Sequence, residues 1–304
     1  MHTDTLFHDY FERWVQVYKE KAVSQATLNK YHSAHDNLHR LAHAVPLSEL
    51  TKRSYQELLN AYADTHAKQT TRDFHTKLKA CLQDAVDEGL LSQNPAHKAI
   101  IKGTDTREVK QKYLNAGELT RLLRSLQLYD EPSPDWLVLI LARTGLRFSE
   151  ALALTPEDIR LASRHICIAR AWDYKSTRQG FTGLKTTAST RRVYIDKALC
   201  IQLKQLTQEL DKTLPMFAMG RVHNSGFNQY LARLCRKADV PVISAHGLRH
   251  TYASLLISQG VSLATVSKQL GHANVGITQQ VYVHLIRELE MVDRRKIEKC
   301  MAGL

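Results

Sequence analysis

The sequence predicts a mainly α-helical protein with a small antiparallel β-sheet, an α+β chain of about two domains. Its 304 residues are 43% hydrophobic and include only 7 Pro and 13 Gly, so the chain is long and apolar enough for two cores. Apolar side chains recur at helical spacing through the first hundred residues and again after residue 196, whereas β-branched residues alternate with a period of two between residues 165 and 196. The polar segment 102–112 separates the two parts. We therefore expect a helical domain at 1–104, a linker at 105–112 and a second domain at 113–304.

The first domain is expected to be a small bundle of four helices. Ser24 is the expected N-cap of the second helix, and the fourth helix should end at Gly89, before the turn at Asn94-Pro95. The four helical patterns cover residues 5–22, 24–41, 51–66 and 70–91.

In the second domain, the strand segments are expected to follow one set of helices along the chain and to precede another. Asn115 and Glu118 resemble a capping box that opens a helix, and a buried apolar helix then breaks at Gly145. Two alternating segments, 165–172 and 190–196, predict an antiparallel pair of strands with a polar connection. Helical patterns cover residues 115–126, 135–146, 147–159, 197–210, 225–238, 244–256, 262–272 and 278–300, the last as a C-terminal packing helix.

The positive charge of the chain is concentrated in its second part. Residues 1–104 hold 13 Lys and Arg against 12 Asp and Glu, whereas residues 105–304 hold 29 against 18. Because neutralisation of phosphates supplies most of the affinity in nucleic-acid binding, this asymmetry favours a polyanionic partner.

Composition argues against a membrane protein and against a metal enzyme. No apolar run approaches the roughly 20 residues of a membrane span, and the N-terminus lacks the basic start and apolar core of a signal peptide. The five cysteines are scattered and never spaced as C-x-x-C, and the 15 histidines include no H-E-x-x-H. We expect a cytoplasmic protein with reduced thiols, no metal, no other cofactor and no membrane partner.

One basic residue, Arg147, follows the buried helix, and another, Lys185, follows the first strand. Arg147 comes directly after the Gly145 turn, and a buried arginine needs an anion or a carboxylate. Glu150, one helical turn further on, is a candidate partner of Arg147, and a phosphate is the second candidate partner. The simpler interpretation is an i,i+3 ion pair between Arg147 and Glu150 alone. Lys185 lies near the mouth of the strand pair, where the simpler reading is a solvated lysine.

The segment SAHGLRHTYASLL, residues 244–256, carries an unusual charge cluster. His246, Arg249 and His250 fall on one face of a helix at 100° per residue. Cations in the first turn of a helix cost roughly 0.3 to 1 kcal/mol each, unless an anion binds there. The simpler reading is a core histidine and a surface arginine. Further along, His272 follows a glycine, and Tyr282 is a candidate nucleophile or simply a core aromatic residue.

Taken in order, these segments resemble the tyrosine recombinase, or phage integrase, family. TGLRFSE, LKTTASTRRV, HGLRHTYAS, LGH and the terminal Tyr-x-His match its pattern over about residues 113–287. The helical first domain is similar to the core-binding domain of the family. The strand region and the ten-residue gap from His272 to Tyr282 look most like integrases of phages and integrative elements. The resemblance therefore implies a core-binding domain followed by a tyrosine-recombinase catalytic domain. Many such integrases carry a further N-terminal arm-binding domain before the core-binding helices; here the first expected helix begins almost at Met1, so either the protein lacks this domain or the chain is truncated.

The resemblance also implies a role for each matching residue. Tyr282 would attack a DNA phosphodiester, which gives a 3′-phosphotyrosyl bond and a free 5′-hydroxyl. Arg147 and Arg249 would hold the non-bridging oxygens, Lys185 would protonate the leaving oxygen, His246 would be the base or hydrogen-bond partner of Tyr282, His272 would be a second phosphate donor, and Glu150 would orient one of the cations. His250 and His284 would only support the scaffold.

Integration and excision of a mobile element, through a Holliday junction, is the function that the resemblance implies. The expected partners are double-stranded DNA attachment sites and three further copies of the chain in a synaptic tetramer, with accessory DNA-bending or directionality proteins as further candidates. Two alternatives stay open at this point. The helices around residues 258–272 are also typical of a helix-turn-helix regulator, and a type IB topoisomerase would use the same tyrosine chemistry; the HGLRHT string favours the recombinase.

Overall fold

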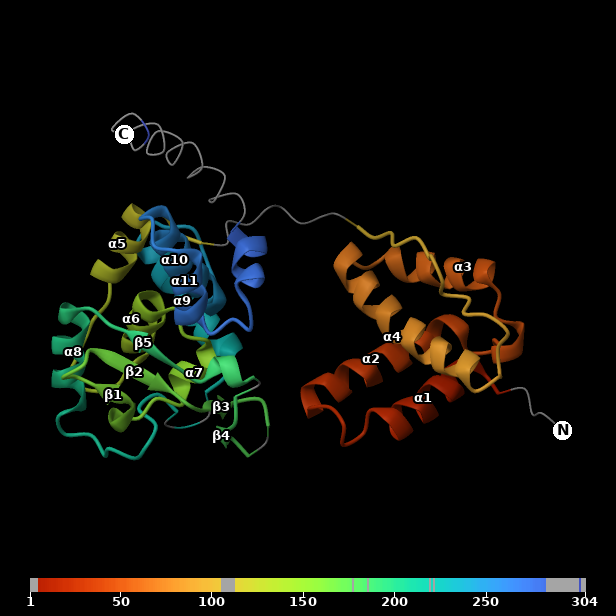
Figure 1. Ribbon diagram of the computed structural model, residues 1–304, viewed down its shortest axis with the longest axis horizontal. Coiled ribbons are helices and arrows are strands. Elements are labelled where there is room, and N and C mark those ends of the chain that lie inside the picture. Colours follow the sequence, from red (N-terminus) through yellow and green to blue (C-terminus); the bar gives the residue numbers. More distant parts are fainter. Residues whose placement is uncertain are drawn as a thin grey trace. The chain divides into compact units, whose positions relative to one another are not determined.

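The computed structural model consists of two compact units, residues 1–109 and 110–304 (Figure 1). It describes residues 5–104, 113–176, 178–184, 186–218, 220, 222–282 and 301. The predicted linker at 105–112 and all but a few residues of the predicted C-terminal helix lie outside these described residues. Each unit has a hydrophobic core of its own.

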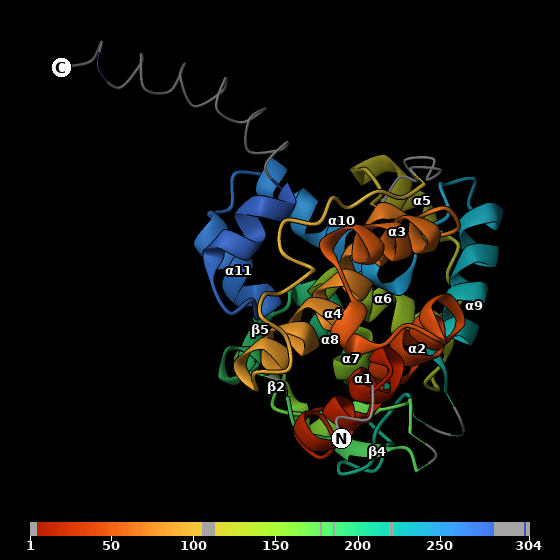
Figure 2. The ribbon, with the colours of Figure 1, turned by 90° about the vertical axis from the view of Figure 1, so that its right-hand side faces the viewer.

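The N-terminal unit is the expected bundle of four helices (Figure 2). They are α1 (Phe7–Tyr18), α2 (Gln25–Ala42), α3 (Lys52–Ala63) and α4 (Lys68–Asp87), with a 3₁₀ turn at Leu47–Glu49. The apolar residues Phe7, Phe11 and Trp14 recur at helical spacing and are buried, which explains why this stretch forms a helix against the others. Ser24 is the N-cap residue of α2, but its hydroxyl bonds to Thr27 Oγ1 rather than to the backbone.

The C-terminal unit is built around α6 (Pro134–Thr144), which is buried along nearly its whole length. This helix ends at Gly145, whose φ of +64° is the left-handed conformation that glycine adopts without strain. The predicted capping box is confirmed, because Asn115 accepts from the backbone of Glu118 and Glu118 from that of Asn115. The remaining α-helices are α5 (Ala116–Arg124), α7 (Phe148–Leu152), α8 (Lys197–Thr207), α9 (Asn224–Lys237), α10 (Ala245–Ser258) and α11 (Leu263–Leu270), and residues 275–282 are helical as well.

The described strands form two small antiparallel sheets instead of the single sheet that the alternation predicted. One sheet has the order β1 (Ile159–Arg160), β2 (His165–Ile168), β5 (Arg191–Tyr194). The other pairs β3 (Ala171–Asp173) with β4 (Gly180–Thr182). The expected strand 165–172 is interrupted at Arg170, whose guanidinium bonds to Thr155 and Asp158.

An aromatic pair explains the second sheet. Trp172 and Phe181 are opposite each other across β3 and β4, with ring centroids 5.2 Å apart in an edge-to-face arrangement. Such cross-strand pairs stabilise short hairpins. Phe181 belongs to the segment that the sequence pattern assigned to a polar connection, so its strand was missed.

Within the described part of the chain, no helix combines the length and apolarity that a membrane crossing needs. The four cysteines that the structure describes are all free, and Cys81 and Cys235 are the buried ones.

Candidate active site

A cluster of arginines lies where α6, α7, β5, α10 and the end of α11 meet. Arg147 is the N-cap of α7, and its guanidinium donates to Glu150 Oε1 at 2.7 Å and to the carbonyl of Gly271 at 3.1 Å. About 38% of the Arg147 side chain remains exposed, so part of its fork faces outward. The predicted pair with Glu150 is therefore present, and it leaves Arg147 accessible to an anion.

Arg249, the fifth residue of α10, is fixed by two backbone carbonyls. Nη1 donates to Gly145 O and Nη2 to Leu270 O, both at 2.7 Å. These carbonyls belong to the C-terminal ends of α6 and α11, where helices leave carbonyls without partners and carry partial negative charge. Arg249 is only 3% exposed. The ends of two helices thus hold a buried guanidinium without a carboxylate of its own.

Glu150 is the carboxylate at the centre of the cluster, and it also binds an arginine that the sequence reading missed. Arg191 on β5 donates to both carboxylate oxygens, at 2.9 and 3.1 Å, and to the carbonyls of Ser189 and Gln269. Burial opposes the charge of Glu150, yet the bonds from Arg191 and Arg147 hold the pKa of its carboxyl below the usual range. Glu150 is therefore a carboxylate at neutral pH.

The cluster carries more positive than negative charge. Among the described residues, Arg147, Arg191 and Arg249 share only the Glu150 carboxylate, which leaves a surplus of two positive charges. Burial and the neighbouring Arg147 lower the pKa of Arg249 to about 9, which still leaves it charged at neutral pH. Uncompensated buried charge is strongly unfavourable. An anion of charge −1 or −2 would balance this surplus of positive charge.

Tyr282 lies beside the cluster with its hydroxyl bonded to a histidine. The phenol is 2% exposed, and its Oη is 2.9 Å from Nδ1 of His250. Burial raises the pKa of Tyr282 to about 12, against a smaller lowering by Arg249. The contact corrects the expectation that His250 bonds only within the scaffold, since its partner is the candidate nucleophile.

The two other predicted histidines lie close to the same charges. His246 remains exposed and packs edge-to-face on His250, with centroids 4.6 Å apart. His272 shares a hydrogen bond of 2.8 Å with Thr278 Oγ1. Partial desolvation and the field of Arg249 and Arg147 lower the pKa of His246, and the same causes lower that of His272 to about 4. Both rings are therefore neutral at pH 7.

The structure thus brings together six of the seven predicted residues, namely Arg147, Glu150, His246, Arg249, His272 and Tyr282. Lys185 and His284 lie outside the described residues. In the described part of the chain, no three His, Cys, Asp or Glu side chains gather in a way that could hold a metal ion.

The sequence did contain a signal for Arg191. Along β5 the burial alternates, so Arg191 shares the inward face with the buried Val193, while Arg192 and Tyr194 are exposed. A charged residue in register with a buried β-branched one indicates a buried ion pair. No local signal marks His250 as the partner of Tyr282, because that contact joins residues 32 positions apart.

Comparison with known proteins gives consistent matches along most of the chain. A model described as the phage integrase family matches residues 112–288, and one described as a phage integrase SAM-like domain matches residues 6–101. A XerC-like tyrosine recombinase of Caldanaerobacter subterraneus subsp. tengcongensis is 26% identical, over 93% of this chain and 80% of that protein. The ICEBs1 integrase of Bacillus subtilis is 25% identical, over 82% of this chain and 71% of that protein.

Two solved structures illustrate the likeness of fold. The Tn1549 transposon integrase, in complex with transposon right end DNA, has a TM-score of 0.76 at 16% identity and covers 95% of this chain and 100% of its own. A lambda integrase dimer bound to a core site has a TM-score of 0.67 at 19% identity, with 91% and 77% covered.

Proposed function

The chain belongs to the phage integrase family, and from that premise we propose that it is a site-specific DNA recombinase that integrates and excises a mobile element. Its reaction would cut and rejoin DNA through a 3′-phosphotyrosyl intermediate. The observation that carries the proposal is the buried Tyr282 phenol beside an arginine cluster with two unmatched positive charges. A DNA phosphodiester would balance the positive charge, and Tyr282 would be the nucleophile.

The arginines account for the electrostatic part of the reaction. Arg147 and Arg249 would donate to the non-bridging oxygens of the phosphate, whose charge grows in the transition state. Both guanidiniums are already held in place by carbonyls or by Glu150, so little reorganisation is needed. Each preorganised donor of this kind lowers a barrier by about 3 to 4 kcal/mol. Arg191 would be a positioning residue that keeps Glu150 ionised and in place.

The proton of Tyr282 needs an acceptor because its pKa of about 12 leaves the phenol protonated at neutral pH. His250 Nδ1 is at hydrogen-bond distance from Oη, so we assign the acceptor role to His250. His246, which packs on the His250 ring, and His272 would donate to phosphate oxygens. As Tyr282 Oη bonds to phosphorus, the bond from phosphorus to the 5′-oxygen breaks. Lys185 would give that oxygen its proton.

The energy of the cleaved bond would be kept in the phosphotyrosyl ester. The 5′-hydroxyl of a second DNA end can attack this ester and release Tyr282, so strands are exchanged rather than hydrolysed. In this exchange, residues 1–104 would be a core-type DNA-binding domain and residues 113–304 the catalytic domain. The C-terminal segment would pack on a neighbouring copy. Four copies of the chain would assemble on two attachment sites. The setting would be the cytoplasm, on the nucleoid, with accessory DNA-bending or directionality proteins as further partners.

The test uses a nicked DNA substrate that traps the cleaved state, incubated with EDTA. Wild-type protein should form a covalent 3′ adduct, whereas Tyr282→Phe, which keeps the ring packing but lacks the hydroxyl, should form none. An adduct with the phenylalanine variant, or cleavage that depends on Mg²⁺, would contradict the mechanism.

The role of His250 is tested separately with His250→Gln on the same substrate. Adduct formation should slow by roughly 10² to 10⁴-fold, the usual contribution of a general base. It should recover in part as the pH is raised, because hydroxide then removes the phenol proton. A pH-independent defect would instead indicate a structural role.

A further inference from the structure

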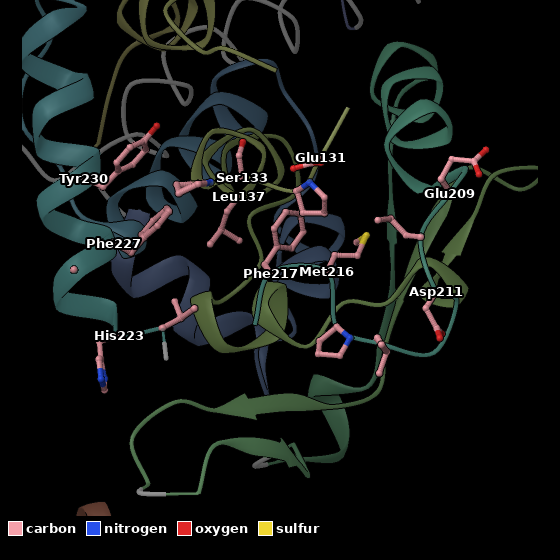
Figure 3. A pocket seen from close by; sticks show the side chains of 17 residues that line it. Glu131, Ser133, Leu137, Glu209, Asp211, Met216, Phe217, His223, Phe227 and Tyr230 are labelled. Atoms are coloured by element: carbon pink, nitrogen blue, oxygen red, sulfur yellow. The ribbon is translucent and has the colours of Figure 1, made fainter. Parts of the chain in front are cut away.

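A cavity, drawn in Figure 3, lies at the start of α6, whereas the arginine cluster lies at the end of that helix. Its volume is about 860 Å³, and Pro134 and Leu137 at the start of α6 line it, whereas Gly145 at the end of α6 belongs to the arginine site. At about 1.5 Å per residue, the helix separates the two by roughly 16 Å. The cavity is therefore distinct from the site at which the phosphate would bind.

The inner wall of the cavity is apolar and contains flexible and aromatic side chains. Met216 and Phe217 lie on it, and Phe227 and Tyr230 on α9 close one side, as Figure 3 shows. Leu214 at the cavity is 54% exposed, so apolar surface is open to solvent. Methionine side chains adapt to differently shaped apolar partners, and aromatic side chains offer a large apolar contact area. These properties suit an inserted aliphatic or aromatic side chain.

The polar groups around this apolar wall are acidic. Glu131, Glu209 and Asp211 line the cavity, together with His223, and none of the described lining residues is a lysine or arginine. Hydrogen bonds from Thr213 lower the pKa of the Asp211 carboxyl, which is ionised at neutral pH. Residues 105–304 as a whole hold 29 Lys and Arg against 18 Asp and Glu. The cavity thus has the opposite sign to the rest of its unit.

This local reversal of charge determines the kind of partner. Nucleic acid is repelled by three carboxylates, whereas a cationic segment is attracted, and complementary charge directs association and specificity. We propose that the cavity docks a cationic amphipathic helical segment of a partner protein. Its apolar side chains enter the cavity between α6 and α9, and its lysines or arginines face Glu131, Glu209 and Asp211. Insertion of an amphipathic helix into an apolar groove is a common mode of peptide recognition.

The probe is a fluorescein-labelled synthetic helix with a leucine face and a lysine face, mixed with the full chain freed of nucleic acid. A matched peptide with the same leucine face and a glutamate face is the control. The positive excess of residues 105–304 disfavours non-specific binding of the lysine peptide to that unit. Fluorescence anisotropy should show saturable binding of the lysine peptide, and at least ten-fold weaker binding of the glutamate peptide.

Two variants place the binding in the cavity. Gly226 on α9 lines it, and a Cβ built there meets nothing within 4 Å, so Gly226→Phe fills the cavity while Gly226→Ala leaves it open. The first should weaken the lysine peptide at least ten-fold and the second should not. The double variant Glu131→Lys, Glu209→Lys changes exposed residues and should also abolish binding.

Three results would overturn the proposal: no saturable binding by the wild-type chain, equal binding of the lysine and glutamate peptides, or binding that Gly226→Phe leaves unchanged. The thermal transition of each variant, followed by circular dichroism, separates loss of the cavity from loss of the fold.

Discussion

The polar groups in the cores of the two units have different kinds of hydrogen-bond partners. In the N-terminal unit, Trp14 donates a hydrogen bond to Asp84, and Tyr10 donates one of 2.8 Å to Glu88. Each of these carboxylates has a donor and lies near the edge of the core. In the C-terminal unit, Arg147 and Arg191 converge on the single carboxylate of Glu150, whereas the neighbouring Arg249 bonds only to backbone carbonyls.

This contrast between the two units shows how a binding site can be recognised without its ligand. The carboxylates of Asp84 and Glu88 in the N-terminal unit are satisfied by donors within the fold, so these bonds stabilise it without a ligand. The guanidinium groups of the arginine cluster are hydrogen-bonded, but the charge of the cluster is not balanced, because three guanidinium groups lie near one carboxylate. Such a charge imbalance marks the arginine cluster as a candidate site for an anionic ligand.

The largest expected effect comes from removing the central carboxylate. Glu150→Gln should lower the free energy of unfolding of the C-terminal unit by about 3 to 5 kcal/mol, because three arginines then lack a counter-charge. Urea denaturation followed by tryptophan fluorescence measures this change. The exposed pair of Arg53 and Glu57 in the N-terminal unit supplies the control, since Glu57→Gln should change the stability by less than about 1 kcal/mol. Equal effects at the two positions would remove the contrast between the units.

The next effect concerns the reaction and not the stability. Arg249→Lys should slow formation of the covalent DNA adduct by roughly 10² to 10³-fold, because an ammonium group cannot reproduce the fixed fork that bonds to Gly145 O and Leu270 O. Arg233→Lys, on the exposed face of α9, should leave the rate unchanged. A lysine variant as fast as the wild type would show that charge alone, without guanidinium geometry, is sufficient.

A smaller effect is expected in the N-terminal unit. Trp14→Phe removes the donor to Asp84 and should lower the stability of this unit by about 1.5 to 3 kcal/mol, the usual value for a hydrogen bond to a charged group. Denaturation followed by circular dichroism measures it. The thermal transition of the C-terminal unit should not shift, and a shift of both transitions would mean that the two units unfold together.

The smallest effect is a pH dependence from His272. Its pKa is about 4 in the folded chain and about 6.5 when unfolded, so the unfolded chain alone binds a proton between these values. Stability should therefore fall as the pH drops from 6.5 to 4, by less than about 1.4 kcal/mol per pH unit for this half-buried ring. The lowered pKa of Glu150 adds a slope of the same sign, but only at the acidic end of this window, below the ordinary carboxyl value of about 4.5.

The control for this prediction is His272→Asn, measured by urea denaturation at several pH values. Asparagine can keep a hydrogen bond to Thr278 without titrating, so the slope between pH 6.5 and 4 should decrease. The lowered pKa values of His246 and His75 leave a residual slope of the same sign. An unchanged slope would mean that His272 is already charged in the folded chain.

Much of the fold was predictable because its signals are local. The periodicity around Phe7, Phe11 and Trp14, the capping box of Asn115 and Glu118, and the helix end at Gly145 depend on residues within one or two turns. The order of the polar motifs also indicated the family, and six of the seven predicted site residues do lie together. The error in the sheet arose at Phe181, whose partner Trp172 lies across a loop that periodicity does not describe.

The helices, the two-part organisation of the charge and the list of groups available for phosphoryl transfer could therefore be predicted from the residues alone. Which of those groups act on one another depends on the folded arrangement of the chain. Arg191 meets Glu150 across 41 positions, Arg249 meets Gly145 across 104, and His250 rather than His246 meets Tyr282. The physical reason is that such bonds depend on how helix ends and strand faces pack in space. Local propensity, which the sequence pattern reports, does not depend on these distant partners.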